Sequence, residues 1–243
     1  MSLINPYTLI MTNSLYVSSP VNALVQGILR EDKTLKQVLR HGNFGLGTFN
    51  DLDGEMVLAD GIFYQLRSDG SVLIPDLNLG TPYACVTQFK PVNSFEAPKQ
   101  VTYSDLQQAI SKSMLSSNLV YAIRIEGTFT KIRLRSVPKQ DAYRPLVEVA
   151  GDQKEFNYEG IAGQLVGFWT PDFMHSISVP GFHLHFLSAD KSHGGHVLDF
   201  LIEEGEVSLQ PLDQLSLDLP HTIEYLHANL DQDNSADLNK AEH

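Results

Sequence analysis

The histidines of this sequence are concentrated in one short stretch. Five of the nine lie between residues 175 and 196, where an even distribution would place roughly one. In GFHLHFLS, His183 and His185 are two residues apart, so on a β-strand both side chains point to one face and the apolar residues to the other. The turn-forming sequence SADKSHGG follows, and His196 begins the next apolar run, HVLDFLI. The pattern predicts a hairpin with histidines on both strands.

A register that places His196 opposite His185 would bring these two and His183 to one face of the hairpin. Opposed Cβ atoms lie about 4.5–5.5 Å apart, so three ring nitrogens can approach one ion at about 2.0–2.1 Å. Three histidines leave coordination positions open for water or substrate, as a catalytic divalent metal requires. The ligands suit zinc, and iron, manganese, nickel or cobalt could also occupy them. His193, in the turn, and His175, on another segment, are expected to lie outside the site.

Two charged residues could complete such a site. Glu55 lies in LDGEMVL, beside a glycine turn and just inside a predicted strand, and Arg135 ends the alternating segment KIRLR. A carboxyl group can move protons, and a planar guanidinium suits a carboxylate ligand. Taken alone, Glu55 is also compatible with a solvated strand edge, and Arg135 with a surface cation.

The composition argues against several classes of protein. With 17 Lys and Arg against 29 Asp and Glu, the net charge is −12, which disfavours general binding of nucleic acid and docking on an anionic membrane. A single cysteine, Cys85, excludes an internal disulfide and a cysteine-based zinc site. The N-terminal residues lack a signal pattern, and no run of about 18 apolar residues occurs, so a cytoplasmic protein is expected.

The hydrophobic spacing predicts the elements that position these residues. Helices are expected near residues 20–29, 33–40, 104–115 and 222–230, and strands near 44–66, 72–74, 84–89, 119–129, 130–138, 145–149, 161–169, 181–188 and 195–209. Asp60-Gly61 is typical of a two-residue hairpin turn. We expect an α+β fold with two sheet-based halves. Residues 1–115 would hold helices and a mixed sheet, and residues 116–243 an antiparallel, β-rich half that carries the metal site and ends in a polar tail.

Three stretches of the chain carry a more specific pattern: FGLGTFNDLDGEMVLADGIFYQL, YAIRIEGTFTKIRLRSVPKQ and VPGFHLHFLSADKSHGGHVLDF. In this order they resemble the signature stretches of the alpha-acetolactate decarboxylase family, and the resemblance extends from about Leu15 to Leu230. The stretch H-x-H…G-G-H-V-x-D-F is highly specific to that family. The resemblance implies a zinc-dependent lyase that converts acetolactate to (R)-acetoin and carbon dioxide. It also implies a homodimer that extends a sheet across its interface.

The resemblance further implies roles for single residues. The metal-binding histidines of the family match the three histidines of the predicted hairpin. Its catalytic glutamate matches Glu55, and its active-site arginine matches Arg135. Thr48 falls where the family has a threonine near the substrate. Glu242 is the candidate for a glutamate of the C-terminal tail that closes the site.

The implied reaction agrees with these residue types. Decarboxylation of a β-keto acid leaves electrons on the former carbonyl, and a metal on the ketone oxygen stabilises that charge. The neighbouring hydroxyl completes a two-point chelate that fixes orientation. Arg135 would hold the carboxylate before it leaves. Glu55 or the tail acid would deliver a proton to one face of the enediolate, unless Glu55 is itself a metal ligand.

Two other classes of protein stay open from the residues. A cupin-like dioxygenase or isomerase also carries H-x-H on a strand and a later histidine. Here the acid expected soon after H-x-H is absent, because FLSA follows, and the interval to His196 is shorter than in cupins. A metal-sensing or structural metal protein would have a closed site with no role for Arg135. An arginine directed at an open metal site would therefore favour an enzyme.

Overall fold

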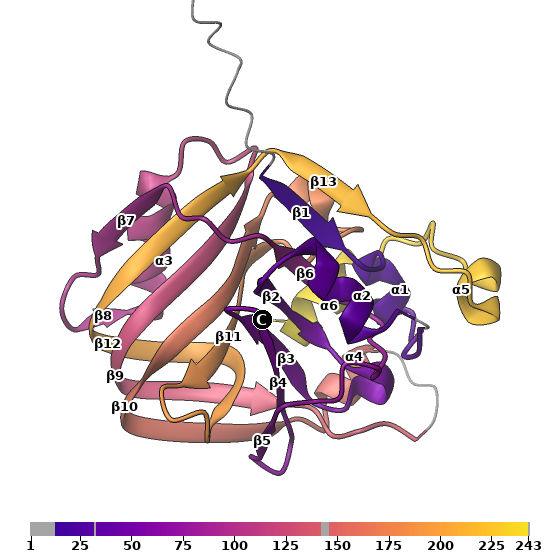
Figure 1. Ribbon diagram of the computed structural model, residues 1–243, viewed down its shortest axis with the longest axis horizontal. Helices are drawn as coiled ribbons and strands as arrows, with labels where there is room; N and C mark the ends of the chain where they lie inside the picture. The colour runs from indigo at the N-terminus through magenta and orange to yellow at the C-terminus, as the bar shows by residue number, and fades with distance from the viewer. Residues whose placement is uncertain (1–12, 32, 142–145, 243) are drawn as a thin grey trace, which may run out of the picture.

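Two β-sheets dominate the computed structural model, which describes residues 13–31, 33–141 and 146–242 (Figure 1). The helices are short: Val21–Val25 (α1), Leu35–Val38 (α2), Tyr103–Ser113 (α3), Leu146–Ala150 (α4), Ile223–His227 (α5) and Ser235–Glu242 (α6). Short 3₁₀ segments span Leu39–His41 (η1), Asn50–Leu52 (η2) and Asp172–Met174 (η3). Among the described residues, no helix has the length and apolar character needed to cross a membrane.

The first sheet is mixed and has seven strands. Their order across the sheet is Gln214–Leu217 (β13), Ser14–Val17 (β1), Ala84–Thr87 (β6), Phe44–Thr48 (β2), Glu55–Ala59 (β3), Ile62–Leu66 (β4) and Val72–Leu73 (β5). β1 and β13 run parallel, and the other neighbours run antiparallel. The turn predicted at Asp60-Gly61 is confirmed, because both residues have positive φ and join paired residues of β3 and β4.

The second sheet is antiparallel. Its order is Gly181–Ser188 (β11), Lys154–Thr170 (β10), Val120–Ser136 (β9), Gly194–Leu212 (β12) and Asn93–Glu96 (β7), with Val101–Thr102 (β8) also paired to β12. β11 pairs with β12 as well as with β10, so these strands and β9 close into a ring. The predicted α+β class, with one mixed and one antiparallel sheet, is confirmed.

Some local predictions were wrong. A strand was expected at residues 145–149, and the structure has the helix α4 at Leu146–Ala150, where Leu146 and Val149 are buried at helical spacing. A short apolar run does not distinguish a helical from a strand period. The two strands expected between residues 119 and 138 form one strand, β9. The helix expected near residues 104–115 is α3, which begins at Tyr103 and ends at Ser113; its N-cap is Thr102, whose hydroxyl accepts a hydrogen bond from the backbone N–H of Asp105.

The C-terminal tail is more than a polar extension. Residues 235–242 form α6, and its Leu238 and Ala241 are 1% and 4% exposed. They belong to the same apolar cluster as Val21 of α1 and Val149 of α4. In Figure 1, α6 lies near the middle of the molecule, whereas α5 projects on an arm at its edge. Two apolar side chains therefore direct an otherwise polar tail inward.

The largest apolar cluster among the described residues joins the two sheets. It contains Leu46 and Cys85 from the first sheet and Ala122 and Phe168 from the second. β2 and β3 contact β10, and β3 also contacts β11. This packing brings the start of β3 against the predicted histidine strand. The sheets also exchange strands across residue 116, because β13 joins the first sheet and β7 and β8 join the second. A domain boundary at this residue stays a prediction.

Candidate active site

The hairpin of β11 and β12 gathers the three histidines. His185 pairs with His196 across the two strands, so the predicted register is confirmed. Alternation along β11 places His183 on the same face. All three side chains are buried, with 7%, 1% and 3% of His183, His185 and His196 exposed. One ring nitrogen from each lies within 4.8 Å of the others, close enough for small ring rotations to bring all three into one coordination shell.

A hydrogen bond across the sheets orients the central imidazole. The Nδ1 of His185 lies 2.8 Å from the backbone oxygen of Met56 on β3. Because a carbonyl oxygen only accepts, Nδ1 carries the proton and Nε2 presents its lone pair to the shared face. Metal-ligating histidines commonly have such a partner on the second nitrogen. Buried, convergent imidazoles with one tautomer fixed therefore fit a divalent metal ion.

Glu55 enters the site from the opposite sheet. It is the first residue of β3 and is 8% exposed. Its Oε2 lies 3.6 Å from Nε2 of His185. Two ligands of one tetrahedral ion are separated by roughly 3.4 Å, given bonds of 2.0–2.1 Å. The carboxylate is therefore placed to bind a metal directly or to act beside it.

Thr48 holds the turn that leads to Glu55. It pairs with Glu55 across β2 and β3, and its hydroxyl donates a hydrogen bond of 2.8 Å to the backbone oxygen of Gly54. Asp51 and Leu52 in the same connection have φ values of 65° and 53°, unusual for residues with side chains. The buried hydroxyl of Thr48 therefore stabilises this strained connection, and the connection sets the position of Glu55.

Gly54 is required by two separate constraints. Its φ is +86°, and a Cβ built on it would lie 2.4 Å from the backbone oxygen of Leu66. Gly54→Ala is expected to lower the free energy of unfolding by more than the roughly 1–3 kcal/mol of a left-handed residue alone, measured by urea denaturation. Gly61→Ala is the matched control, because Gly61 has φ +81° but nothing within 4 Å of its Cβ position. Equal losses in the two variants would contradict the close-contact argument.

Arg135 reaches the site from β9. It pairs with His196 on β12, and only 5% of it is exposed. The strands approach closely there, since a Cβ on Gly195 would lie 2.6 Å from the backbone oxygen of Arg135. The glycine pair before His196, which the sequence indicated as part of a turn, therefore also permits close strand pairing. A buried guanidinium beside the histidines is the arrangement expected for an anionic ligand.

Five of the residues predicted for the site line one small cavity of about 40 Å³, and His196 is not among its lining residues. Thr48, Glu55, Arg135, His183 and His185 line it. Its apolar lining was not predicted from sequence, and comes from Leu24, Leu52, Tyr83, Val137, Leu146 and Ala241. These residues carry no local chemical signal, because they become neighbours only through folding. The volume holds a few water molecules, so a larger ligand requires the lining to shift.

Glu242 is the last residue of α6, and its side chain lies outside the part of the chain that the structure describes. Its neighbour Ala241 lines the cavity, so the helix that carries Glu242 reaches the site.

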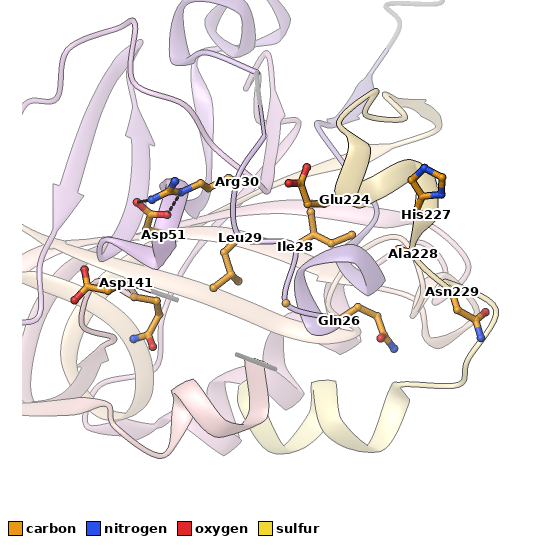
Figure 2. Close-up of a pocket in the computed structure, with 12 residues that line it drawn as sticks. Gln26, Ile28, Leu29, Arg30, Asp51, Asp141, Glu224, His227, Ala228 and Asn229 are labelled. Carbon is orange, nitrogen blue, oxygen red and sulfur yellow. Dashed lines mark hydrogen bonds and ion pairs between the residues drawn. The ribbon is translucent and has the colours of Figure 1, made fainter. Parts of the chain in front are cut away.

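A larger cavity, of about 530 Å³, is lined in part by Asp51 of η2 (Figure 2). Ile28 and Leu29 contribute apolar surface, and the Arg30 guanidinium pairs with the carboxylate of Asp51. Asp51 lines this cavity while the next residue, Leu52, lines the smaller one. Two members of the histidine group, His183 and His185, line the smaller cavity, which is therefore the candidate active site.

The sequence matches a known family over most of its length. The family model described as alpha-acetolactate decarboxylase matches residues 15–232. The alpha-acetolactate decarboxylase of Methylococcus capsulatus is 39% identical over 231 residues, covering 95% of this chain and 89% of that protein. The one from Klebsiella aerogenes is 40% identical over 223 residues, covering 90% and 85%. The crystal structure of the Bacillus subtilis strain 168 enzyme superimposes with a TM-score of 0.92 at 36% identity, covering 94% of this chain and 99% of that chain.

Proposed function

The chain belongs to the alpha-acetolactate decarboxylase family, and on this premise we propose that its buried histidine group holds the catalytic metal of an enzyme that converts acetolactate to acetoin. The activity follows from family membership. The observation that carries the assignment of the site is the group of three buried imidazoles, two of which line one cavity together with a carboxylate and a guanidinium from the two sheets. Arg135 beside the histidines favours an enzyme over a structural metal site.

The residues fit a divalent transition metal, and we propose zinc on the basis of the resemblance; the same nitrogens suit iron, manganese, nickel or cobalt. When bound, such an ion supplies Lewis acidity at the ketone oxygen of the substrate. His183, His185 and His196 would hold it, with the carboxyl group of Glu55 beside it.

The charged residues Arg135 and Glu55 have separate roles in the reaction. Arg135 orients the substrate carboxylate, whose bond to the adjacent carbon breaks as carbon dioxide leaves. Orientation favours the reaction only if the carboxylate is not held more tightly in the ground state than during bond breaking. The carbon that loses carbon dioxide must then gain a proton, and we assign this step to the carboxyl group of Glu55, which lines the cavity and whose Oε2 lies 3.6 Å from Nε2 of His185.

The remaining assignments also follow the resemblance. We propose that Glu242 closes the site, supported by Ala241 in the cavity lining. Thr48 would contribute to the substrate pocket, and its bond to Gly54 also fixes the approach of Glu55. Protonation from one fixed side gives a single enantiomer, (R)-acetoin by the resemblance.

A direct assay tests this function. The purified protein, loaded with zinc, is expected to release acetoin from racemic acetolactate, and chiral gas chromatography should show an excess of the (R) form. Glu55→Gln is expected to reduce turnover by about 10²–10⁴-fold, the usual contribution of general acid–base catalysis. Absence of acetoin from folded, metal-loaded protein would overturn the proposal. Full activity of the Glu55→Gln variant would remove Glu55 from the mechanism.

We also propose a homodimer, which the resemblance implies. β13 is an edge strand with Leu215 43% exposed, and the α5 arm exposes Leu219, Ile223 and Leu226 at 58%, 74% and 64%. An open strand edge beside exposed apolar side chains is typical of a surface that a second copy covers. Light scattering that gives only the 27.0 kDa monomer would contradict it.

A further inference from the structure

Two helices from distant parts of the chain border the active-site cavity. Leu24 of α1 and Ala241 of α6 both line it. Leu238 and Ala241 are buried in the apolar cluster that also contains Leu24. Because α6 ends at Glu242, the residue proposed to close the site, the way in which α6 docks on the protein determines where that end lies.

The buried face of the tail includes one polar residue. Of residues 231–241, only Asn234, Leu238 and Ala241 are buried, and their spacing of four and then three residues places them on one helical face. Asn234 directly precedes α6, and its backbone oxygen accepts a hydrogen bond of 2.9 Å from the N–H of Leu238. An asparagine that is 7% exposed thus extends the face formed by two apolar side chains.

The side chain of Asn234 is hydrogen-bonded to α1. Its Oδ1 accepts a hydrogen bond of 2.9 Å from Nε2 of Gln26, the C-cap residue of α1. The same nitrogen donates to Oε1 of Gln232 at 3.4 Å, so one amide group contacts the tail at two points. Apolar packing is not directional, whereas a hydrogen bond has a defined length and angle. A buried amide that loses its partner costs free energy, so the contact with Gln26 disfavours other registers of the helix.

The register of α6 matters because it sets the position of the C-terminal end of the helix. An α-helix rises about 1.5 Å and turns by about 100° per residue, so a shift by one residue displaces and rotates the position of Glu242. A displacement of about 1 Å can lower a reaction rate about 10²-fold when the displaced group acts on the substrate. The contact at the start of α6 therefore affects the geometry at its end.

We propose that Asn234 is a positioning residue that fixes the register of α6 on α1 and thereby places the C-terminal end of α6, with Glu242, at the cavity. This inference rests on the proposed role of Glu242. Asn234 acts through the helix and is not a catalytic residue, because it is not among the residues that line the cavity.

The first test is limited proteolysis of Asn234→Leu, which keeps the approximate size of the side chain and removes the acceptor. Trypsin can cut after Lys240 only when the end of α6 opens. Because cleavage follows the population of the open form, residues 241–243 should be released about two- to twelvefold faster than from wild-type protein, the factor for loss of one hydrogen bond. Cleavage after Lys112, at an exposed position of α3, should not change.

The second test is steady-state kinetics on the zinc-loaded protein. Asn234→Leu is expected to lower kcat for acetolactate about tenfold with a smaller change in KM, because Arg135 and the three histidines do not lie on α6. In a Glu242→Gln background the same substitution should change kcat by less than about twofold, since the group that it positions has been removed. A purely structural role would give the same loss in both backgrounds.

Asn239→Leu is the matched control, because it makes the same substitution on the exposed face of α6. It is expected to change neither the cleavage rate nor kcat. Unchanged cleavage after Lys240 in Asn234→Leu would overturn the docking role, and an equal loss of kcat in both backgrounds would overturn the positioning role. Wild-type protein that makes no acetoin would overturn the proposed function, whereas proteolysis would still decide whether Asn234 docks α6.

Discussion

Replacing His183 with alanine is expected to remove the metal and the activity together. Its ring is one of three buried imidazoles whose nitrogens lie within 4.8 Å of one another, and two histidines bind a divalent ion far more weakly than three. Because a Lewis acid contributes several kcal/mol to the reaction, kcat/KM should fall by about a thousandfold or more. Metal content measured by mass spectrometry after dialysis should fall to background.

A specific loss of metal and activity must be distinguished from unfolding of the variant. His183→Gln keeps more of the volume, and it should also lose the metal. Metal that binds the folded state raises the melting temperature of wild-type protein, and this shift should vanish in both variants. His193→Ala is the control: the His193 ring packs against Tyr158 in a tilted arrangement, with ring centroids 4.5 Å apart, and is not part of the histidine group. Full metal content in His183→Ala, or metal loss in His193→Ala, would contradict the assignment.

Replacing Arg135 is expected to separate metal binding from turnover. The side chain lines the cavity but offers no metal ligand, so Arg135→Ala should retain the metal. Without a donor fork for the substrate carboxylate, kcat/KM should fall by about 10²–10³-fold, the loss found when one preorganised donor is removed from an active site. Steady-state kinetics and metal analysis on the same preparation measure both effects.

Two further variants sharpen this result. Arg135→Lys keeps the charge but not the planar fork, so it should recover only part of the activity. Arg133→Ala removes a cation two residues away on the same strand, where the side chain is 51% exposed, and should leave turnover near the wild-type value. If Arg133→Ala and Arg135→Ala lose activity equally, the loss results from removing a positive charge in this region and not from removing a specific carboxylate-binding group.

The metal-binding hairpin could be predicted from sequence because its information is local. The H-x-H spacing fixes His183 and His185 on one face of any strand, and the glycine-containing turn limits how the next strand returns. The register between His185 and His196 follows from that short connection. Asp60-Gly61 was predictable for the same reason, since a two-residue turn leaves one pairing for its flanking strands.

The segments that were wrongly predicted lacked such a local constraint. Residues 146–150 are apolar enough for a strand or a helix, and packing between α4 and α6 selects the helix. The tail 235–242 shows little pattern because only two of its described side chains, Leu238 and Ala241, enter the core. Their contribution depends on the presence of an apolar surface elsewhere in the fold.

The sequence by itself determined which residue types could bind a metal and which three of the nine histidines share one face of a hairpin. The tertiary structure decided what stands opposite them. Glu55 meets His185 only because β3 packs against β11. Strand alternation is imposed by covalent geometry over two residues, whereas sheet packing depends on burial of side chains distant in the chain. The ligands could therefore be predicted from spacing, and their partners could not.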